Sequence, residues 1–274
     1  MATLGLCLVY GPLSRTAAVQ QIEAQLLDLR FRLRPDAPPS DQIVLVLIDD
    51  RSIREIGRWP WSRGIMADAL TWLNAAGART IGLDLLFAEP EPAAVPGAWL
   101  ERLRAGLDAL VAEGASGIDP ETILQRLLDD LSGDPALAAT MHTAGNVVLP
   151  YSFGFGEPID AAPAAPPPAV AMTAFRVVHG LDRARARLPM VATSLLAPIP
   201  ELAGAAASLG HTNVRLDRDG AARFEFPAVA YGSEIYPSFA LEVARAHLGV
   251  PREKVRLELD RGVWLGDRLV PTDE

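Results

Sequence analysis

Two apolar segments in the first third of the chain have the pattern of buried strands. Residues 43–48 are continuously apolar and rich in β-branched side chains, and residues 79–87 return to this pattern. Between them, apolar residues recur at helical spacing from Ile65 to Ala76, and Gly77 follows as a helix cap. Continuous apolar runs are typical of strands covered on both faces, so the pattern predicts a βαβ unit with parallel strands and a right-handed crossover.

Acidic residues stand at the ends of this predicted unit. The first strand stops at Asp49 and Asp50, and the second contains Asp84. Because the strands should be parallel, Asp49 and Asp84 are expected at the same edge of the sheet, where open α/β proteins place their chemistry. They could bind a divalent cation through carboxylate oxygens. Alternatively, Asp50 or Ser52 caps the following helix, while Asp84 fixes a loop by hydrogen bonds.

A Trp59-Pro60-Trp61 turn leads into the helical segment and is followed by Arg63. The two indoles could stack on a ligand, or they could close an edge of the core. Arg63 could hold a ligand carboxylate through two hydrogen bonds. An internal salt bridge from Arg63 to Asp49 or Asp84 explains the arginine equally well.

The N-terminal region divides into two parts. Residues 2–13 are apolar for about ten positions, too few to cross a bilayer, which needs ~20. We interpret residues 1–14 as the end of a truncated transmembrane segment, with an ordinary buried helix as the alternative. Residues 15–34 then predict a juxtamembrane amphipathic helix, whose apolar positions are Val19, Ile22, Leu26, Leu29 and Leu33.

The middle of the chain predicts a helical insertion and a long loop. Helical patterns at 99–113 and 120–131 form a hairpin within an insertion at 89–133, and a strand follows at 146–151. The Pro- and Ala-rich segment 156–170 predicts an exposed extended loop, because it can form neither ladder nor helix.

The last third predicts antiparallel structure around one helix. A short helix at 199–207 precedes a strand at 208–216, and a turn at 217–220 closes a hairpin. Residues 237–248 predict a helix, and the alternating pattern after it predicts short antiparallel strands. The fold class is therefore α/β, with a central mixed sheet and flanking helices.

Two polar groups in this part are further candidates for a site. His211 and Asn213 lie two apart on one predicted strand, hence on one face, where they could complete a polar pocket or be hydrogen-bonded within the fold. Asp217-x-Asp219-Gly220 is similar to the opening of a calcium loop, but position 228 is Ala where the distal glutamate would stand. A β-turn is the simpler interpretation.

Composition narrows the function classes. The 274 residues carry 34 acidic and 25 basic side chains, for a net charge of −9, with no basic stripe of the kind that binds nucleic acid. Cys7 is the only cysteine, so neither an intrachain disulfide nor a thiolate metal site can form. Strand-end aspartates would suit a Mg-dependent phosphohydrolase that uses Asp49 and Asp84. No glycine-rich phosphate loop, G-x-S-x-G or H-E-x-x-H motif accompanies them. No cofactor is predicted.

The ordered motifs resemble one known family. Asp-Asp-x-Ser, Gly-x-Trp-Pro-Trp and Arg fall within sixteen residues in the block IDDRSIREIGRWPWSR, and this combination resembles the type-two CHASE domain. Weaker blocks in the same order occupy residues 28–34, 76–87, 134–150, 209–220 and 236–249. The insertion at 89–133 departs from shorter family members.

The resemblance implies a bacterial sensory domain. Such domains lie on the extracytoplasmic side of the cell membrane between flanking membrane helices and signal to a cytoplasmic output such as a nucleotide cyclase or a histidine kinase. Residues 35–274 would form one sensor domain, non-catalytic itself, that binds an unknown small-molecule or protein signal and pairs as a homodimer. A ligand-free dimerisation scaffold is the other alternative. The candidate ligand-binding residues are Asp49, Asp50, Ser52, Trp59, Trp61, Arg63, Asp84, His211 and Asn213.

Overall fold

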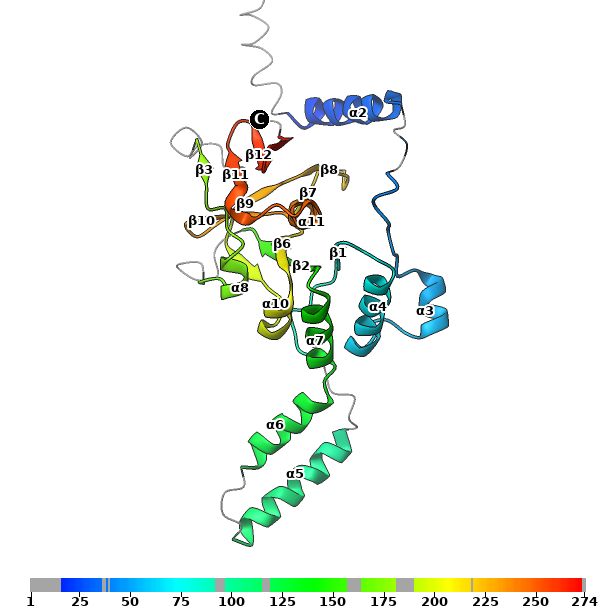
Figure 1. The fold of residues 1–274 in the computed structure, drawn as a ribbon, viewed down its shortest axis with the longest axis vertical. Coiled ribbons are helices and arrows are strands. Elements are labelled where there is room, and N and C mark those ends of the chain that lie inside the picture. The colour runs from blue at the N-terminus through cyan, green and yellow to red at the C-terminus, as the bar shows by residue number, and fades with distance from the viewer. Residues whose placement is uncertain are drawn as a thin grey trace, which may run out of the picture. The chain divides into compact units, whose positions relative to one another are not determined.

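The computed structural model describes residues 16–35, 38, 40–91, 97–114, 119–156, 164–180, 190–217 and 219–272 (Figure 1). By its internal contacts the chain divides into two compact units, one ending at Gly57 and the other beginning at Arg58. Each unit is described by itself. The predicted membrane-helix end at 1–14 lies outside the described residues.

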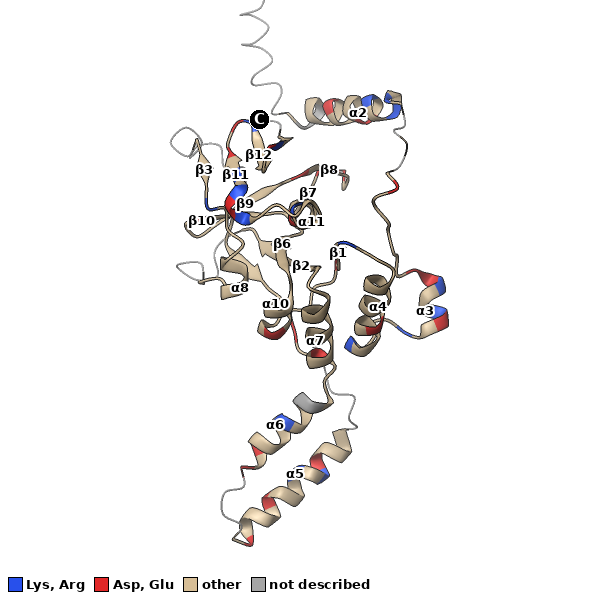
Figure 2. Cartoon of the chain, in the orientation of Figure 1, with Lys and Arg blue, Asp and Glu red and all other residues tan. Residues whose placement is uncertain are grey.

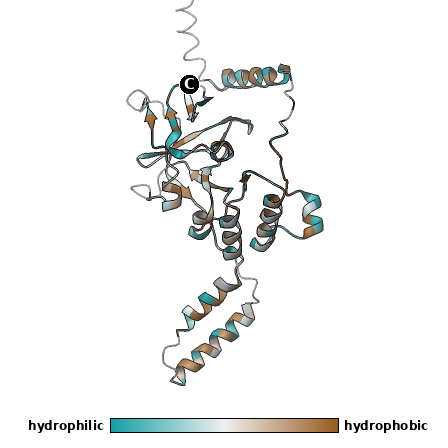
Figure 3. Cartoon of the chain, in the orientation of Figure 1, coloured by the Kyte–Doolittle hydropathy of each residue, from teal (hydrophilic) through white to brown (hydrophobic). Residues whose placement is uncertain are grey.

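Within its described residues, the first unit contains two helices, α2 (Ala17–Leu33) and α3 (Asp50–Ile56). The apolar side chains of α2 are largely exposed, with Leu29 at 49% and Leu33 at 74%. Apolar and polar residues alternate around α2 in Figure 3. Basic and acidic residues lie side by side on α2 and α3 in Figure 2. None of the helices among the described residues is long and apolar enough to cross a membrane.

The predicted strand at 43–48 is wrong. These residues form neither helix nor strand, and their side chains are between 39% and 79% exposed. A strand forms only where its backbone hydrogen-bonds to a neighbouring strand. An apolar run in the sequence does not show whether such a neighbour is present. Of the second predicted strand, only β1 (Ile81–Gly82) forms.

The parallel strand pairs are not those predicted between residues 43–48 and 79–87, but involve a strand further along the chain. β2 (Val147–Gly154) is the central strand of a mixed sheet: it pairs in parallel with β1 and with β6 (Ser208–His211), and antiparallel with β5 (Ser194–Leu196). The crossover from β1 to β2 contains α5, α6 and α7, and the return from β2 to β6 contains α10. The first half of β2 is fully buried, as its apolar run predicts.

Helices cover this sheet and complete the main core. They are α4 (Arg63–Ala75), α7 (Asp134–Ala144), α10 (Pro200–Ala205) and α11 (Phe239–Leu248). Leu70 of α4, Leu137 of α7 and Leu202 of α10 are buried in one cluster with Leu149 of β2. The predicted start and end of α11 are confirmed, because the Ser238 side chain accepts from the Leu241 amide and Gly249 ends the helix in the left-handed conformation.

Among the described residues, the remaining strands form three further sheets, of four, three and two strands. The predicted antiparallel strands at the C-terminal end are confirmed in the order β13-β12-β11, with β3 parallel to β11. The predicted hairpin around the 217–220 turn is also confirmed as β7 paired with β8. The bounds are β3 (Val178–His179), β4 (Val191–Ala192), β7 (Val214–Leu216), β8 (Ala222–Glu225), β9 (Ala228–Tyr231), β10 (Glu234–Pro237), β11 (Val255–Glu258), β12 (Gly262–Leu265) and β13 (Arg268–Pro271).

The two helices predicted at 99–113 and 120–131 are confirmed, and the loop prediction is partly wrong. α5 (Gly97–Ala112) and α6 (Pro120–Leu131) lie side by side, away from the sheets (Figure 1). Within the predicted loop at 156–170, residues 157–163 lie outside the described residues, and α8 (Pro168–Ala171) is a helical turn. Proline is compatible with the first helical position, where no amide hydrogen bond is required.

Candidate functional site

Asp49 of the first unit serves as the cap of α3. One Asp49 side-chain oxygen accepts hydrogen bonds from the Ser52 amide at 2.8 Å and the Ser52 hydroxyl at 2.6 Å. These bonds lower the pKa of Asp49, the hydroxyl contributing most. Asp50 occupies the first turn of α3, where a negative charge interacts favourably with the helix dipole. The cap is thus formed by Asp49, and not by Asp50 or Ser52 as the sequence had indicated.

Arg63 pairs with an acid that the sequence did not connect with it. Its Nε donates to Asp134 Oδ1 at 2.8 Å, and its Nη2 donates to the Glu89 carbonyl at 3.1 Å. The guanidinium also lies over the Phe87 ring, 4.3 Å from the centroid. The predicted salt bridge to Asp49 or Asp84 is therefore wrong. Asp84 itself is exposed.

A second carboxylate completes this arrangement. Glu91 accepts from the Arg63 amide at 2.8 Å and from the Gly133 amide at 2.7 Å, while its own amide donates to Asp134 at 2.7 Å. These bonds join the start of α4 and the start of α7 to the segment after Phe87. Their role is to hold both ends of the helical insertion on the domain.

The two tryptophans of the turn contact each other edge to face, with ring centroids 5.6 Å apart. Trp61 packs against the main core, while Trp59 is 36% exposed. The Trp59–Pro60 peptide bond is cis. Packing therefore accounts for Trp61, and Trp59 stays partly available at the surface.

His211 and Asn213 contact different groups. Asn213 accepts from the Phe153 amide at 2.8 Å and donates to the Phe153 carbonyl at 2.7 Å, so its amide extends the edge of β2. His211 is only 1% exposed, lies among Tyr151 and Phe153, and has no hydrogen-bond partner for either ring nitrogen within the part of the chain that the structure describes. Burial lowers the pKa of His211 to about 4. The imidazole is therefore a neutral part of the core at physiological pH.

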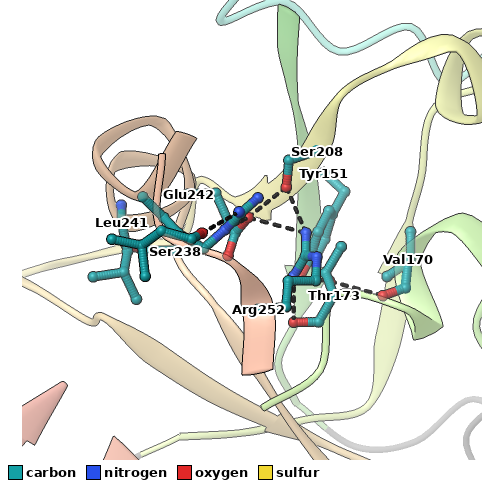
Figure 4. A network of polar contacts seen from close by, with 10 residues as sticks. Tyr151, Val170, Thr173, Ser208, Ser238, Leu241, Glu242 and Arg252 are labelled. Carbon is teal, nitrogen blue, oxygen red and sulfur yellow. Dashed lines mark hydrogen bonds and ion pairs between the residues drawn. The ribbon is translucent and has the colours of Figure 1, made fainter. Parts of the chain in front are cut away.

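A buried ionic network was missed by sequence reasoning. One Glu242 oxygen accepts from Arg245 Nε at 2.9 Å, from Arg252 Nη2 at 3.0 Å and from the Ser208 hydroxyl (Figure 4). Glu242 is 1% exposed, and burial lowers the pKa of Arg252. The network joins α11, β6 and η1 (Arg252–Lys254). The available signal was a glutamate between apolar residues of the predicted helix, with Arg245 three positions later.

The Asp217–Asp219 turn holds an arginine. Arg223 donates to Asp217 at 2.8 Å and to Asp219 at 2.9 and 2.7 Å. This guanidinium lowers the pKa of Asp219 to about 2. The two carboxylates that could have begun a calcium loop thus face a cation from the same hairpin. Among the described residues, no group of three or more His, Cys, Asp or Glu side chains could hold a metal ion.

Two cavities lie beside the sheets of the second unit. One has a volume of about 780 Å³ and is lined by residues that include Arg176, Glu234 and Tyr231. The other has a volume of about 630 Å³, and its lining includes Leu196 and again Tyr231. Neither cavity is lined by any of the nine residues predicted from the sequence.

These observations define a mixed α/β domain in which the buried charged groups brace the fold and the open cavities lie elsewhere. The chain matches the family model of the CHASE2 domain over residues 3–274, and it belongs to the CHASE2 domain family. CHASE2 domains are sensory extracellular domains of signalling receptors. No curated protein and no solved structure matches the chain.

Proposed function

We propose that the chain is the extracytoplasmic input domain of a bacterial membrane receptor, and that two copies pair along α2. The output is a nucleotide cyclase or a sensor kinase, and the domain is itself non-catalytic. The membership of the whole chain in a sensory family supports the first part. The arrangement of apolar residues on α2 supports the second.

The apolar stripe of α2 has the spacing of a coiled-coil seam. Its members are three and four residues apart in strict alternation, which is the heptad pattern. Four of the five members are 49–74% exposed, and the fifth, Val19, is partly buried. We call these residues the α2 seam: Val19, Ile22, Leu26, Leu29 and Leu33.

The residues flanking the α2 seam are compatible with a parallel pair. In that alignment Gln25 of one copy lies opposite Arg30 of the other, so no like charges face each other at this step. With 17 residues, α2 is only slightly longer than the ~12–15 residues below which an isolated helix is marginal in water. Tethering to a membrane raises the effective concentration of the two helices to about millimolar and favours pairing.

A pair of helices gives a sensor its means of transmission. A signal changes the receptor only if it binds one arrangement of the pair more tightly than the other, because equal affinity shifts no equilibrium. If the helices pair but no signal changes their arrangement, the domain is a dimerisation scaffold instead.

The side of the membrane is tested by labelling the complete protein in intact cells. Cys7 is the only cysteine of these 274 residues, so Cys7→Ser, with serine also at any cysteine in the rest of the receptor, removes the background, and Phe31→Cys adds one exposed thiol on α2. A maleimide that cannot cross the cytoplasmic membrane should label this thiol equally in intact and lysed cells. Labelling that requires lysis would place the domain in the cytoplasm and refute the proposal.

A further inference from the structure

The smaller of the two cavities lies where the central strand of the main sheet ends. Its lining includes Gly154 and Phe155 at the end of β2, and Thr193 to Leu196 in and beside β5. β2 pairs in parallel with β1 and β6 as far as Tyr151 and antiparallel with β5 from Ser152 to Gly154, so the cavity lies beyond the carboxyl end of the parallel pairing. In open α/β sheets, ligands bind outside the carboxyl ends of parallel strands. We call this space the β2-end cavity.

The lining of the β2-end cavity is apolar with a few hydroxyl groups. Leu195, Leu196 and Ile199 supply apolar surface, and Thr193 and Ser194 supply hydroxyls. No charged side chain occurs among its described lining residues. A charged ligand would lose its hydration here without gaining a counter-charge, which is costly.

The neighbouring cavity of about 780 Å³ provides a contrast within the same domain. Its lining includes Arg176 and Glu234, so charge is available there. Tyr231 lines both cavities, as do Ala164 and Ala165, and its hydroxyl donates to the Ala164 carbonyl at 2.7 Å. Burial raises the pKa of Tyr231, so the hydroxyl keeps the proton for this bond at neutral pH.

Contacts with the core hold the Tyr231 ring in place. Tyr231 is 3% exposed, and its ring centroid lies 5.3 Å from that of Phe153 on β2. The β2-end cavity is therefore a preformed space with one fixed aromatic wall. Its volume of about 630 Å³ falls within the range of roughly 300–1,000 Å³ that small-molecule sites occupy.

We infer that the β2-end cavity binds a small, uncharged, mostly apolar organic molecule with room for one or two hydrogen bonds to Thr193 or Ser194. This inference rests on the proposed sensory function, because it names the chemical class of the signal. It also assigns the signal to residues outside the Asp49–Asp84 region.

A pair of dyes with one ring skeleton tests the charge requirement. N-phenyl-1-naphthylamine is uncharged, and 1-anilino-8-naphthalenesulfonate adds a sulfonate to the same rings. The neutral dye should bind the whole chain saturably with one site, and the sulfonate should bind at least about tenfold more weakly, a difference of about 1.4 kcal/mol. Equal affinities, or no saturable binding of the neutral dye, would overturn the inference.

Tryptophan substitutions locate the dye. Leu196→Trp fills the β2-end cavity from its exposed side and should weaken the neutral dye at least about tenfold. Met172→Trp places the same ring in the other cavity, and Leu216→Trp places it on β7 outside both; each should leave the affinity unchanged. Loss of binding in either control, or retained binding in Leu196→Trp, would contradict the assignment. Failure here refutes the cavity but leaves the cell-labelling result intact, so the two proposals fail separately.

Discussion

Replacing Glu242 by glutamine should destabilise the second unit strongly. The Glu242 side chain is 2% exposed and is the shared counter-charge of Arg245 and Arg252, which are 11% and 22% exposed. Glutamine keeps the size and an acceptor oxygen but leaves two largely buried guanidinium groups without their anion. Removing one partner of a buried ion pair costs about 3–5 kcal/mol. The conservative shape of glutamine places the expected loss at about 3 kcal/mol, the lower end of that range.

Two matched variants separate this effect from a general loss of charge. Glu253→Gln removes an acid of the same type from a pair with Arg176 in which both side chains are more than half exposed, and should cost at most about 1 kcal/mol. Ser208→Ala removes one neutral donor from the buried network and should cost about 1–2 kcal/mol. The free energy of unfolding of each variant is measured by urea denaturation, with the slope against urea compared to that of the unchanged protein. A loss below 1 kcal/mol for Glu242→Gln, or a loss equal to that of Glu253→Gln, would refute the reasoning.

Three further predictions concern single residues. Arg63→Met should lower the free energy of unfolding by about 3 kcal/mol in urea denaturation, because Asp134 remains buried without its cation; a loss under 1 kcal/mol would contradict the ion-pair account. Asp49→Ala should weaken the start of α3, seen as faster hydrogen exchange at the Ser52 amide, whereas unchanged exchange would exclude the cap. Because the pKa of His211 is about 4 when folded and 6.5 when unfolded, the unfolded state binds more protons between these values. The contribution of neutral His211 to the free energy of unfolding should therefore be fully present above pH 6.5. It should fall by about 3 kcal/mol as the pH drops towards 4. His211→Phe should flatten this part of the pH profile, and a profile that keeps its slope would assign the dependence to other groups.

Local features of the fold could be predicted because their causes are local. Ser238 and Gly249 delimit α11 through hydrogen bonds and backbone conformations within a few residues, and the 217–220 turn closes its hairpin in the same way. The helical insertion follows from periodicity alone. Each of these elements depends on residues that are adjacent in the sequence.

Features that depend on distant partners were predicted poorly. Residues 43–48 and β2 carry similar apolar runs, yet only β2 has neighbouring strands to pair with. An internal salt bridge was one of two alternatives for Arg63, but its partner Asp134 lies 71 positions away and nothing in the sequence connects them. The β2-end cavity is formed by the ends of strands and loops that are likewise far apart along the chain.

The candidate site residues show the same division. Asp49 functions in capping, one of the two roles left open for the acidic residues, because a cap requires only the next turn. His211 and Asn213 are two positions apart in the sequence. The His211 side chain is buried in the core, whereas the Asn213 side chain binds the edge of β2. Their spacing in the sequence predicted one shared face, but the contacts of each side chain depend on the neighbouring strands.

The pairing of two copies along the α2 seam is tested most directly by disulfide cross-linking. In the background in which Cys7 and any cysteine elsewhere in the receptor are replaced by serine, Leu29→Cys places a thiol in the seam, and Phe31→Cys places one of similar exposure, 59% against 49%, outside it. Disulfides require Cα atoms within about 7 Å, a distance that a coiled coil provides at the seam. Mild oxidation of the complete protein in membranes should yield covalent dimers at least about tenfold faster for Leu29→Cys than for Phe31→Cys. Equal rates, or a faster rate at position 31, would contradict the paired-helix account.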